Sequence, residues 1–225
     1  MNVQRHRGFP VRLSVSDDLE GEIMLGLPKS TELNKPLPKT AIYTKFQMNA
    51  AEKAKIDADI SRIVIVNEVS AAKLNLAPGE SVQAFFVLQV TLKRREFSEK
   101  TLITLSKLIP QNMVLLLEYD GQAKMAVYHT KLLQTPWCDP ADLTLTIKGL
   151  TMDAVWENVI VQVGNIRMQS GNTLDQQIVQ DEQRAKLEKE IARLEKLAWT
   201  EKQPKKKFEL AQRIKNLKEQ RNMCK

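Results

Sequence analysis

Continuous apolar runs alternate along the chain with segments that have helical spacing. The runs at 60–70 (ISRIVIVNEVS) and 82–92 (VQAFFVLQVTL) are rich in β-branched residues and predict strands. The first contains four consecutive apolar residues, as expected of a strand buried on both faces. The pair Asp120-Gly121 separates two further apolar runs and favours the positive φ angles of a tight turn, which predicts a β-hairpin over 112–130.

Helical signals lie between and after these runs. Asn49 is a helix-capping residue in front of 50–59, and the apolar residues of 99–109 share one helical face. A third helix is predicted at 151–164, after a strand at 142–150 whose residues alternate between polar and apolar. Because a helix separates two groups of strands, we expect a mixed sheet with flanking helices, in the α/β or α+β class.

The order of these elements divides the chain into three parts. Residues 1–24 have little periodicity and are predicted to be an N-terminal extension, whereas 25–168 contain all the predicted strands and form the body. The body begins with a lead-in at 27–40, where three prolines indicate irregular or extended structure. The remaining part, 172–225, is predicted to be a basic helical hairpin.

The apolar residues of this last part recur at the spacing of a coiled-coil seam. A first helix is expected from Thr173 to Thr200, and Pro204 suits the first turn of a second helix. One narrow apolar stripe on each helix favours an antiparallel αα-hairpin. The stripes consist of Leu187, Ile191, Leu194, Leu210, Ile214 and Leu217. Three interpretations stay open: the hairpin closes on itself or on the body, it docks a partner protein, or it pairs with a second copy as a homodimer.

Positive charge is concentrated in the tail. Of the net charge of +7, residues 181–225 supply most, with 14 Lys and Arg against 8 Asp and Glu. Basic side chains that lie in a cluster can contact phosphates without reading the base sequence, so two interpretations stay open: the cluster contacts DNA non-specifically, or it is an ordinary solvated, charged bend. The candidate residues lie at the bend and at one predicted strand end; they are Lys202, Lys205, Lys206, Lys207, Arg213, Lys93, Arg94 and Arg95. The nearby aromatic residues, Trp199 and Phe208, are expected to pack at the hairpin tip.

No enzymatic motif is present in the chain. The eight glycines form no phosphate-binding loop, and the two histidines and two cysteines are too scattered for a zinc site. We therefore expect no catalytic residues, no cofactor and no metal. The alternative is a metal-dependent nuclease of restriction-endonuclease-like fold, in which Glu68, Glu80 and Glu118 would converge. One observation argues against this nuclease. Its active-site strand usually contains an acidic residue, any residue and then a lysine, and no lysine of the chain has an Asp or Glu two positions before it.

The sequence also predicts where in the cell the protein is located. No apolar run approaches the roughly 18–20 residues needed to cross a bilayer, and the N-terminal region has no apolar core of a signal peptide. Two cysteines in 225 residues are typical of a reducing compartment. We expect a cytoplasmic protein that makes no membrane contact.

Several passages resemble one bacterial family. They are LPKSTELNKPLPKTAIY, VQAFFVLQVTLKRREFSEKTLITLSKLIPQNMVLLLEYDG and the lysine-rich pair of C-terminal helices. Together they are similar to the family numbered 4391 in the domain-of-unknown-function series, from Leu25 to the C-terminus. Members of that family tend to be encoded beside helicases and DNA methyltransferases, in restriction or phage-defence neighbourhoods. No catalytic residues are assigned to the family, so none are carried over.

The resemblance implies an accessory role. We expect a non-enzymatic adaptor subunit of a DNA-processing or phage-defence complex, in which the hairpin docks a helicase or DNA methyltransferase. The six seam residues would make the apolar contact, and the lysines at the bend would lie near DNA.

Overall fold

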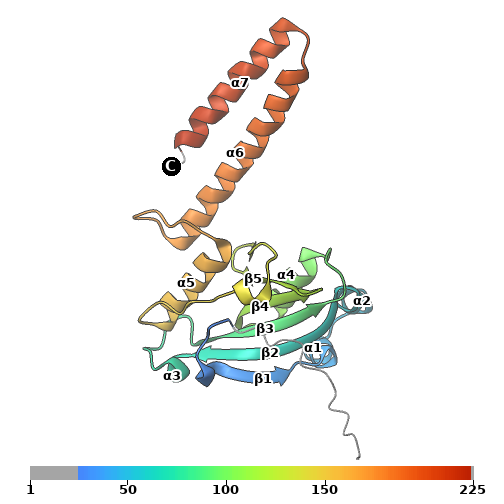
Figure 1. Ribbon diagram of the computed structural model, residues 1–225, viewed down its shortest axis with the longest axis vertical. Helices are drawn as coiled ribbons and strands as arrows, with labels where there is room; N and C mark the ends of the chain where they lie inside the picture. The colour runs from blue at the N-terminus through green and yellow to red at the C-terminus, as the bar shows by residue number, and fades with distance from the viewer. Residues whose placement is uncertain (1–24, 224–225) are drawn as a thin grey trace, which may run out of the picture.

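The computed structural model describes residues 25–223 of the chain (Figure 1), so the predicted extension at 1–24 lies outside the described residues. A six-stranded sheet in the order β1-β2-β3-β4-β5-β6 forms the centre of the body. All neighbouring strands are antiparallel except β3 and β4, which are parallel and joined by helix α4 (Glu99–Leu108). The strands are β1 (Glu32–Pro36), β2 (Ile60–Ser70), β3 (Ala84–Leu92), β4 (Asn112–Tyr119), β5 (Gln122–Tyr128) and β6 (Leu132–Gln134). The predicted mixed sheet with a helical crossover is confirmed.

Helices cover both faces of this sheet and form two cores. One face packs against α1 (Lys39–Lys45), α2 (Ala50–Asp59) and α4. The opposite face packs against α3 (Ala71–Leu74), α5 (Met152–Gly164) and the first turns of α6 (Leu174–Thr200). Alternate residues of β3 and β4 point into the two cores, so these central strands are apolar on both faces. No helix in the described part of the chain is long and apolar enough to span a membrane.

Short-range signals in the sequence act as predicted. Asn49 caps α2 through a reciprocal pair of hydrogen bonds with Glu52, and Asp120 and Gly121 form the turn between β4 and β5 with φ values of +48° and +70°. The two helices of the tail are α6, capped by Thr173, and α7 (Pro204–Met223). Each signal depends only on residues within a few positions of it, which is why sequence alone finds it.

The strand predicted at 142–150 is wrong. Leu143 and Leu145 are buried, as the alternation suggested, but within residues 25–223 the segment belongs to no strand and runs mostly as a loop. Its backbone groups bond elsewhere: the N–H of Leu145 donates to the carbonyl of Leu25 at 2.9 Å. The side chain of Gln162 bonds both the N–H and the carbonyl of Thr146. The alternation of polar and apolar residues therefore indicates which side chains of this segment are buried, but it does not show that the segment is a strand.

The proline-rich lead-in at 27–40 is more ordered than its composition indicates. Its middle forms β1, an exposed edge strand that pairs with β2 and ends at Pro36. A proline is tolerated at a sheet edge because its missing N–H would face solvent. Lys39 then begins α1, a short helix that the sequence pattern did not predict.

The paired C-terminal helices project from the body, with the bend at the end farthest from the sheet (Figure 1). The base of α6 is anchored, because Leu174 and Ile178 are buried in the core beneath α5. Gln177, also buried, bonds the N–H of Gln169 and the side chain of Asn172. These contacts hold the turn before α6 in place and make the hairpin an extension of the folded body.

Candidate interaction surface on the C-terminal hairpin

The six predicted seam residues lie between α6 and α7. Ile191 and Leu194 are 5% and 2% exposed, and the remaining four are half-buried; these are Leu187, Leu210, Ile214 and Leu217. Ion pairs cross the seam on either side, from Lys218 to Glu195 at 2.7 Å and from Arg213 to Glu190 at 3.8 Å. The stripes are therefore used to close the hairpin on itself. A partner protein would meet the outer surface of the hairpin.

The outer surface near the bend carries large exposed apolar side chains. Trp199 is 88% exposed, Phe208 71% and Leu197 44%. The expectation that Trp199 and Phe208 pack at the tip is wrong for a geometrical reason. Each residue of an α-helix turns by about 100°, so Trp199 points away from the seam that its neighbour Ala198 joins. Phe208, two positions before Leu210, is likewise turned outward.

Basic side chains are also concentrated near the bend. The exposed residues at the bend include Lys202, Lys205, Lys206 and Lys207, and Arg213 follows on α7. An open hollow lies between the two helices at the bend; it is lined by Leu197, Thr200, Glu201, Lys202, Gln203, Lys206, Glu209, Leu210 and Arg213. Between Trp199 and Arg213 the chain has five basic residues and two carboxylates, so this segment has a net positive charge. The five basic residues predicted at the bend are thus brought together.

The second predicted basic patch has structural contacts and lies apart from the bend. Lys93 donates to the backbone carbonyl of Asp57 at 2.6 Å, and the Arg94 Nε donates to Asp59 at 2.9 Å. The Arg95 guanidinium lies 5.8 Å from the centre of the Trp137 ring. These residues follow β3 in the body, far from the hairpin bend (Figure 1). The structure therefore does not join the two patches into one surface.

The carboxylates considered for a nuclease do not converge. Glu68 pairs across the sheet with Phe86 and Glu118 with Thr91, so their partners on β3 are five residues, or about 17 Å, apart. Glu80 lies in the loop before β3. Among residues 25–223, no three His, Cys, Asp or Glu side chains are grouped closely enough to hold a metal ion.

Two of these carboxylates have ordinary partners. Glu68 forms an ion pair with Lys73 at 2.9 Å, and Glu118 accepts a hydrogen bond from Gln89 at 2.7 Å. Such contacts are typical of strand residues at a solvated sheet surface. No observation in the described region favours a carboxylate active site.

The fold and surface define an α+β protein with a projecting, basic helical hairpin. The model of the family described as "Domain of unknown function (DUF4391)" matches residues 25–220, and the chain belongs to this family. The resemblance noted in the sequence is thereby confirmed over most of the chain. Neither the curated proteins nor the solved structures include a match to this chain.

Proposed function

We propose that this protein is a non-enzymatic, cytoplasmic accessory subunit of a bacterial DNA-processing or phage-defence complex. Its hairpin docks a larger subunit, a helicase or DNA methyltransferase. The observation that carries the proposal is the exposure of two large aromatic side chains, Trp199 on α6 and Phe208 on α7, near the bend of a projecting hairpin. The seam residues act indirectly in this proposal, because they hold the two helices together behind the contact surface.

The chemistry of the tip suits a protein contact. Tryptophan and other aromatic residues supply a large share of binding energy at protein interfaces, especially when a polar rim excludes water around them. The lysines at the bend provide such a rim, and a positive rim also accelerates association with an acidic surface. A closed seam leaves the tip preorganised, so little conformational entropy is lost on docking.

The position of the tip also supports docking. Helix α6 has 27 residues, which correspond to about 40 Å at 1.5 Å per residue. Its base is held in the body by Leu174 and Ile178, and the His129 Nε2 lies 2.7 Å from the Asp175 carboxylate. The contact surface is therefore presented at a distance from the sheet, where a large partner can approach it without meeting the body.

A secondary contact with DNA is part of the proposal. Lys205, Lys206 and Lys207 are consecutive, exposed and free of close ion pairs within the described residues. Lysines of this kind interact with phosphates without base specificity, and the interaction weakens steeply as the salt concentration rises. The DNA contact would add to the docking of a partner that itself binds DNA.

A double substitution of Trp199→Ser and Phe208→Ser is expected to weaken partner binding by at least 100-fold, or about 2.7 kcal/mol. Both side chains are exposed, so the fold is expected to be unaffected. The measurement is co-purification of the tagged full-length chain from cells that carry its native neighbouring genes, followed by mass spectrometry and titration of the purified partner.

The matched control is Leu150→Ser, because Leu150 is 84% exposed but lies in the body. Recovery of a helicase or DNA methyltransferase with the wild type and the control, but not with the double variant, would support the proposal. Equal recovery with all three proteins would exclude the tip as the docking surface. Recovery of no such subunit with the wild type would contradict the adaptor role.

A further inference from the structure

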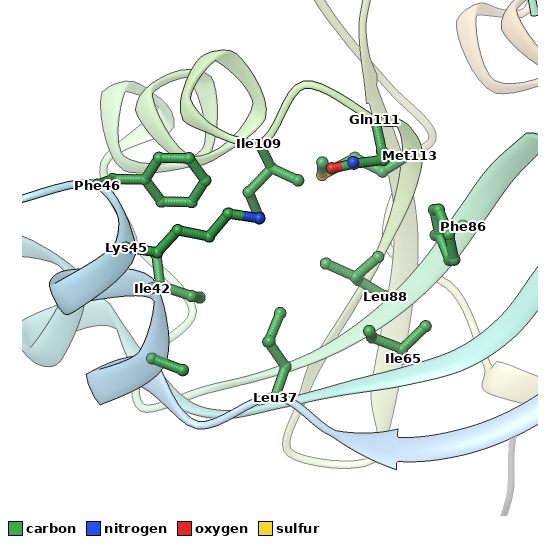
Figure 2. A pocket seen from close by; sticks show the side chains of 11 residues that line it. Leu37, Ile42, Lys45, Phe46, Ile65, Phe86, Leu88, Ile109, Gln111 and Met113 are labelled. Atoms are coloured by element: carbon green, nitrogen blue, oxygen red, sulfur yellow. The ribbon is translucent and has the colours of Figure 1, made fainter.

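A small apolar pocket lies on the face of the sheet that carries α1 and α4 (Figure 2). Its floor is made of residues from three adjacent strands, in which Ile65 pairs with Leu88 and Phe86 pairs with Met113. The pocket has a volume of about 250 Å³. Ile65 and Phe86 are half-buried whereas Leu88 and Met113 are buried, so only part of this apolar floor is left uncovered between the helices.

The walls of the pocket come from two separate parts of the chain. One wall is α1 with the short segment that precedes it, and it includes Leu37, Ala41 and Ile42. The other wall is the segment after α4, where Ile109 faces α1 across the hollow (Figure 2). Pro110 ends α4 at this point, so the helix does not extend over the floor.

Only two of the lining residues have polar side chains. Figure 2 shows the Lys45 side chain crossing the pocket from α1, with its ammonium close to Ile109, and the Gln111 amide at the opposite wall. In the described part of the chain, Lys45 has no carboxylate partner; its ammonium lies 5.5 Å from the centre of the Phe46 ring. By contrast, Lys39 on the same helix is paired with Asp57.

We propose that this pocket binds a small organic anion with an apolar body, of which a medium-chain monocarboxylate is the simplest form. The carboxylate would pair with Lys45 and accept a hydrogen bond from the Gln111 amide, while the hydrocarbon part would cover Ile65, Phe86 and Leu88. Ligand sites in proteins typically combine an apolar lining with a few polar groups that fix orientation. Lys45 and Gln111 are both exposed, so they lie at the solvent-facing edge of the apolar pocket, where an ammonium and an amide can bind the charged end of an amphipathic anion.

A peptide segment is a poorer occupant for two reasons. The hollow is smaller than the 300–1,000 Å³ typical of sites for drug-sized ligands, so it accommodates only a compact molecule. The adjacent sheet edge is β1, whose Lys35 and Pro36 oppose the pairing of an added strand. The proposal is independent of the docking role of the hairpin.

The test is titration calorimetry of the full-length chain with octanoate and with 4-phenylbutyrate. Saturable binding of at least one acid at a 1:1 ratio is expected. Lys45→Met should weaken that binding at least tenfold, because it removes the ammonium but keeps the length of the side chain. Lys55→Met is the matched control, since Lys55 is an exposed lysine on α2 that does not line the pocket.

Two further measurements separate the pocket from non-specific binding. Octan-1-ol carries no charge, so its affinity should be the same for the wild type and Lys45→Met. Ala41→Phe should abolish binding of every probe, because Ala41 lines the pocket from an exposed position where a larger side chain fills the space without disturbing the core. The proposal is overturned if neither acid binds, if Lys45→Met and Lys55→Met have equal effects, or if Ala41→Phe, with an unchanged melting temperature, binds as the wild type does.

Discussion

Replacing Ile191 with Asp is expected to separate α7 from α6 while the sheet body stays folded. Ile191 is 5% exposed and sits in the middle of the seam. The substitution loses about 2–3 kcal/mol of apolar burial, and placing a carboxylate there without a partner costs several kcal/mol more. A single narrow stripe holds the two helices together, so a loss of this size exceeds what the remaining contacts supply.

The expected result is measured in two ways. The far-UV circular dichroism signal at 222 nm should fall, because a detached helix of 20 residues is marginally stable in water. Trypsin should cleave within α7 at concentrations that leave the wild type intact. The control is Ala192→Asp, which adds the same charge at the next, exposed position. An Ile191→Asp protein with unchanged helicity and protease resistance would show that the seam does not stabilise the hairpin.

Comparing Ile191→Asp with the double substitution of Trp199 and Phe208 distinguishes two causes of lost partner binding. Ile191→Asp should abolish docking together with the hairpin structure, whereas the change of Trp199 and Phe208 should abolish docking with the circular dichroism spectrum unchanged. If only Ile191→Asp affects binding, the contact involves the folded hairpin but not its aromatic tip.

The second large effect is expected for Asp59→Ala in the body. Asp59 ends α2, and its side chain is 2% exposed. The carboxylate accepts hydrogen bonds from the Thr101 hydroxyl at 2.9 Å, from the Ser98 N–H at 3.2 Å and from the Arg94 guanidinium. It thereby joins the end of α2 to the start of α4, where the N-cap residue Ser98 makes no side-chain capping hydrogen bond of its own.

Removing this carboxylate should lower the free energy of unfolding by about 3 kcal/mol at pH 7. The buried Thr101 hydroxyl and the Ser98 N–H lose their acceptor, and an unsatisfied buried polar group typically costs about 1–3 kcal/mol. Arg94 contributes less to the loss because its side chain is 57% exposed and can be hydrated. Urea denaturation measures the difference, with Asp57→Ala as the control. The Asp57 carboxylate is half exposed, so its ion pair with Lys39 is expected to contribute at most about 1 kcal/mol.

The effect should depend on pH in a defined direction. Burial alone would raise the pKa of Asp59, but the hydrogen bonds from Arg94, Thr101 and the Ser98 N–H outweigh it and lower the pKa below the usual 3.8. A carboxylate with a lowered pKa in the folded state stabilises the protein fully above its unfolded pKa and loses this contribution as the pH falls through the folded pKa. The difference between the wild type and Asp59→Ala should therefore be largest at neutral pH and decrease below about pH 4. A difference that is absent at pH 7, or that grows in acid, would contradict this role.

Sequence patterns predicted the two helices of the hairpin but not which surface covers their apolar stripes. The heptad stripes correctly located two helices and their antiparallel pairing, since the period of a helix is the same in any context. The same stripes do not specify whether a second helix, the body or another protein covers them. Burial of Ile191 and Leu194 against α7 answers that question in the structure, and it moves the proposed contact to Trp199 and Phe208.

The residues of the two predicted basic patches also differ in a way that the sequence did not show. Lys93, Arg94 and Arg95 were as basic in the sequence as the lysines at the bend, yet their contacts are with a carbonyl, a buried carboxylate and an aromatic ring. Those partners come from residues 57, 59 and 137, far along the chain. A local cluster of positive charge in the sequence therefore does not by itself indicate a phosphate-binding surface, because distant parts of the chain can supply its partners.

The sequence by itself determined the features that arise within a few residues or one repeating period. These are the capped helix after Asn49, the turn at Asp120-Gly121, the helix between β3 and β4, and the two helices of the tail. The tertiary structure decided everything that depends on which segments become neighbours. It made 142–150 a loop and 32–36 an edge strand, exposed the two aromatic residues at the tip, and left an apolar pocket with Lys45 beside it. The physical reason is that secondary structure follows local backbone preferences, whereas burial and pairing depend on contacts between residues that the chain brings together only when it folds.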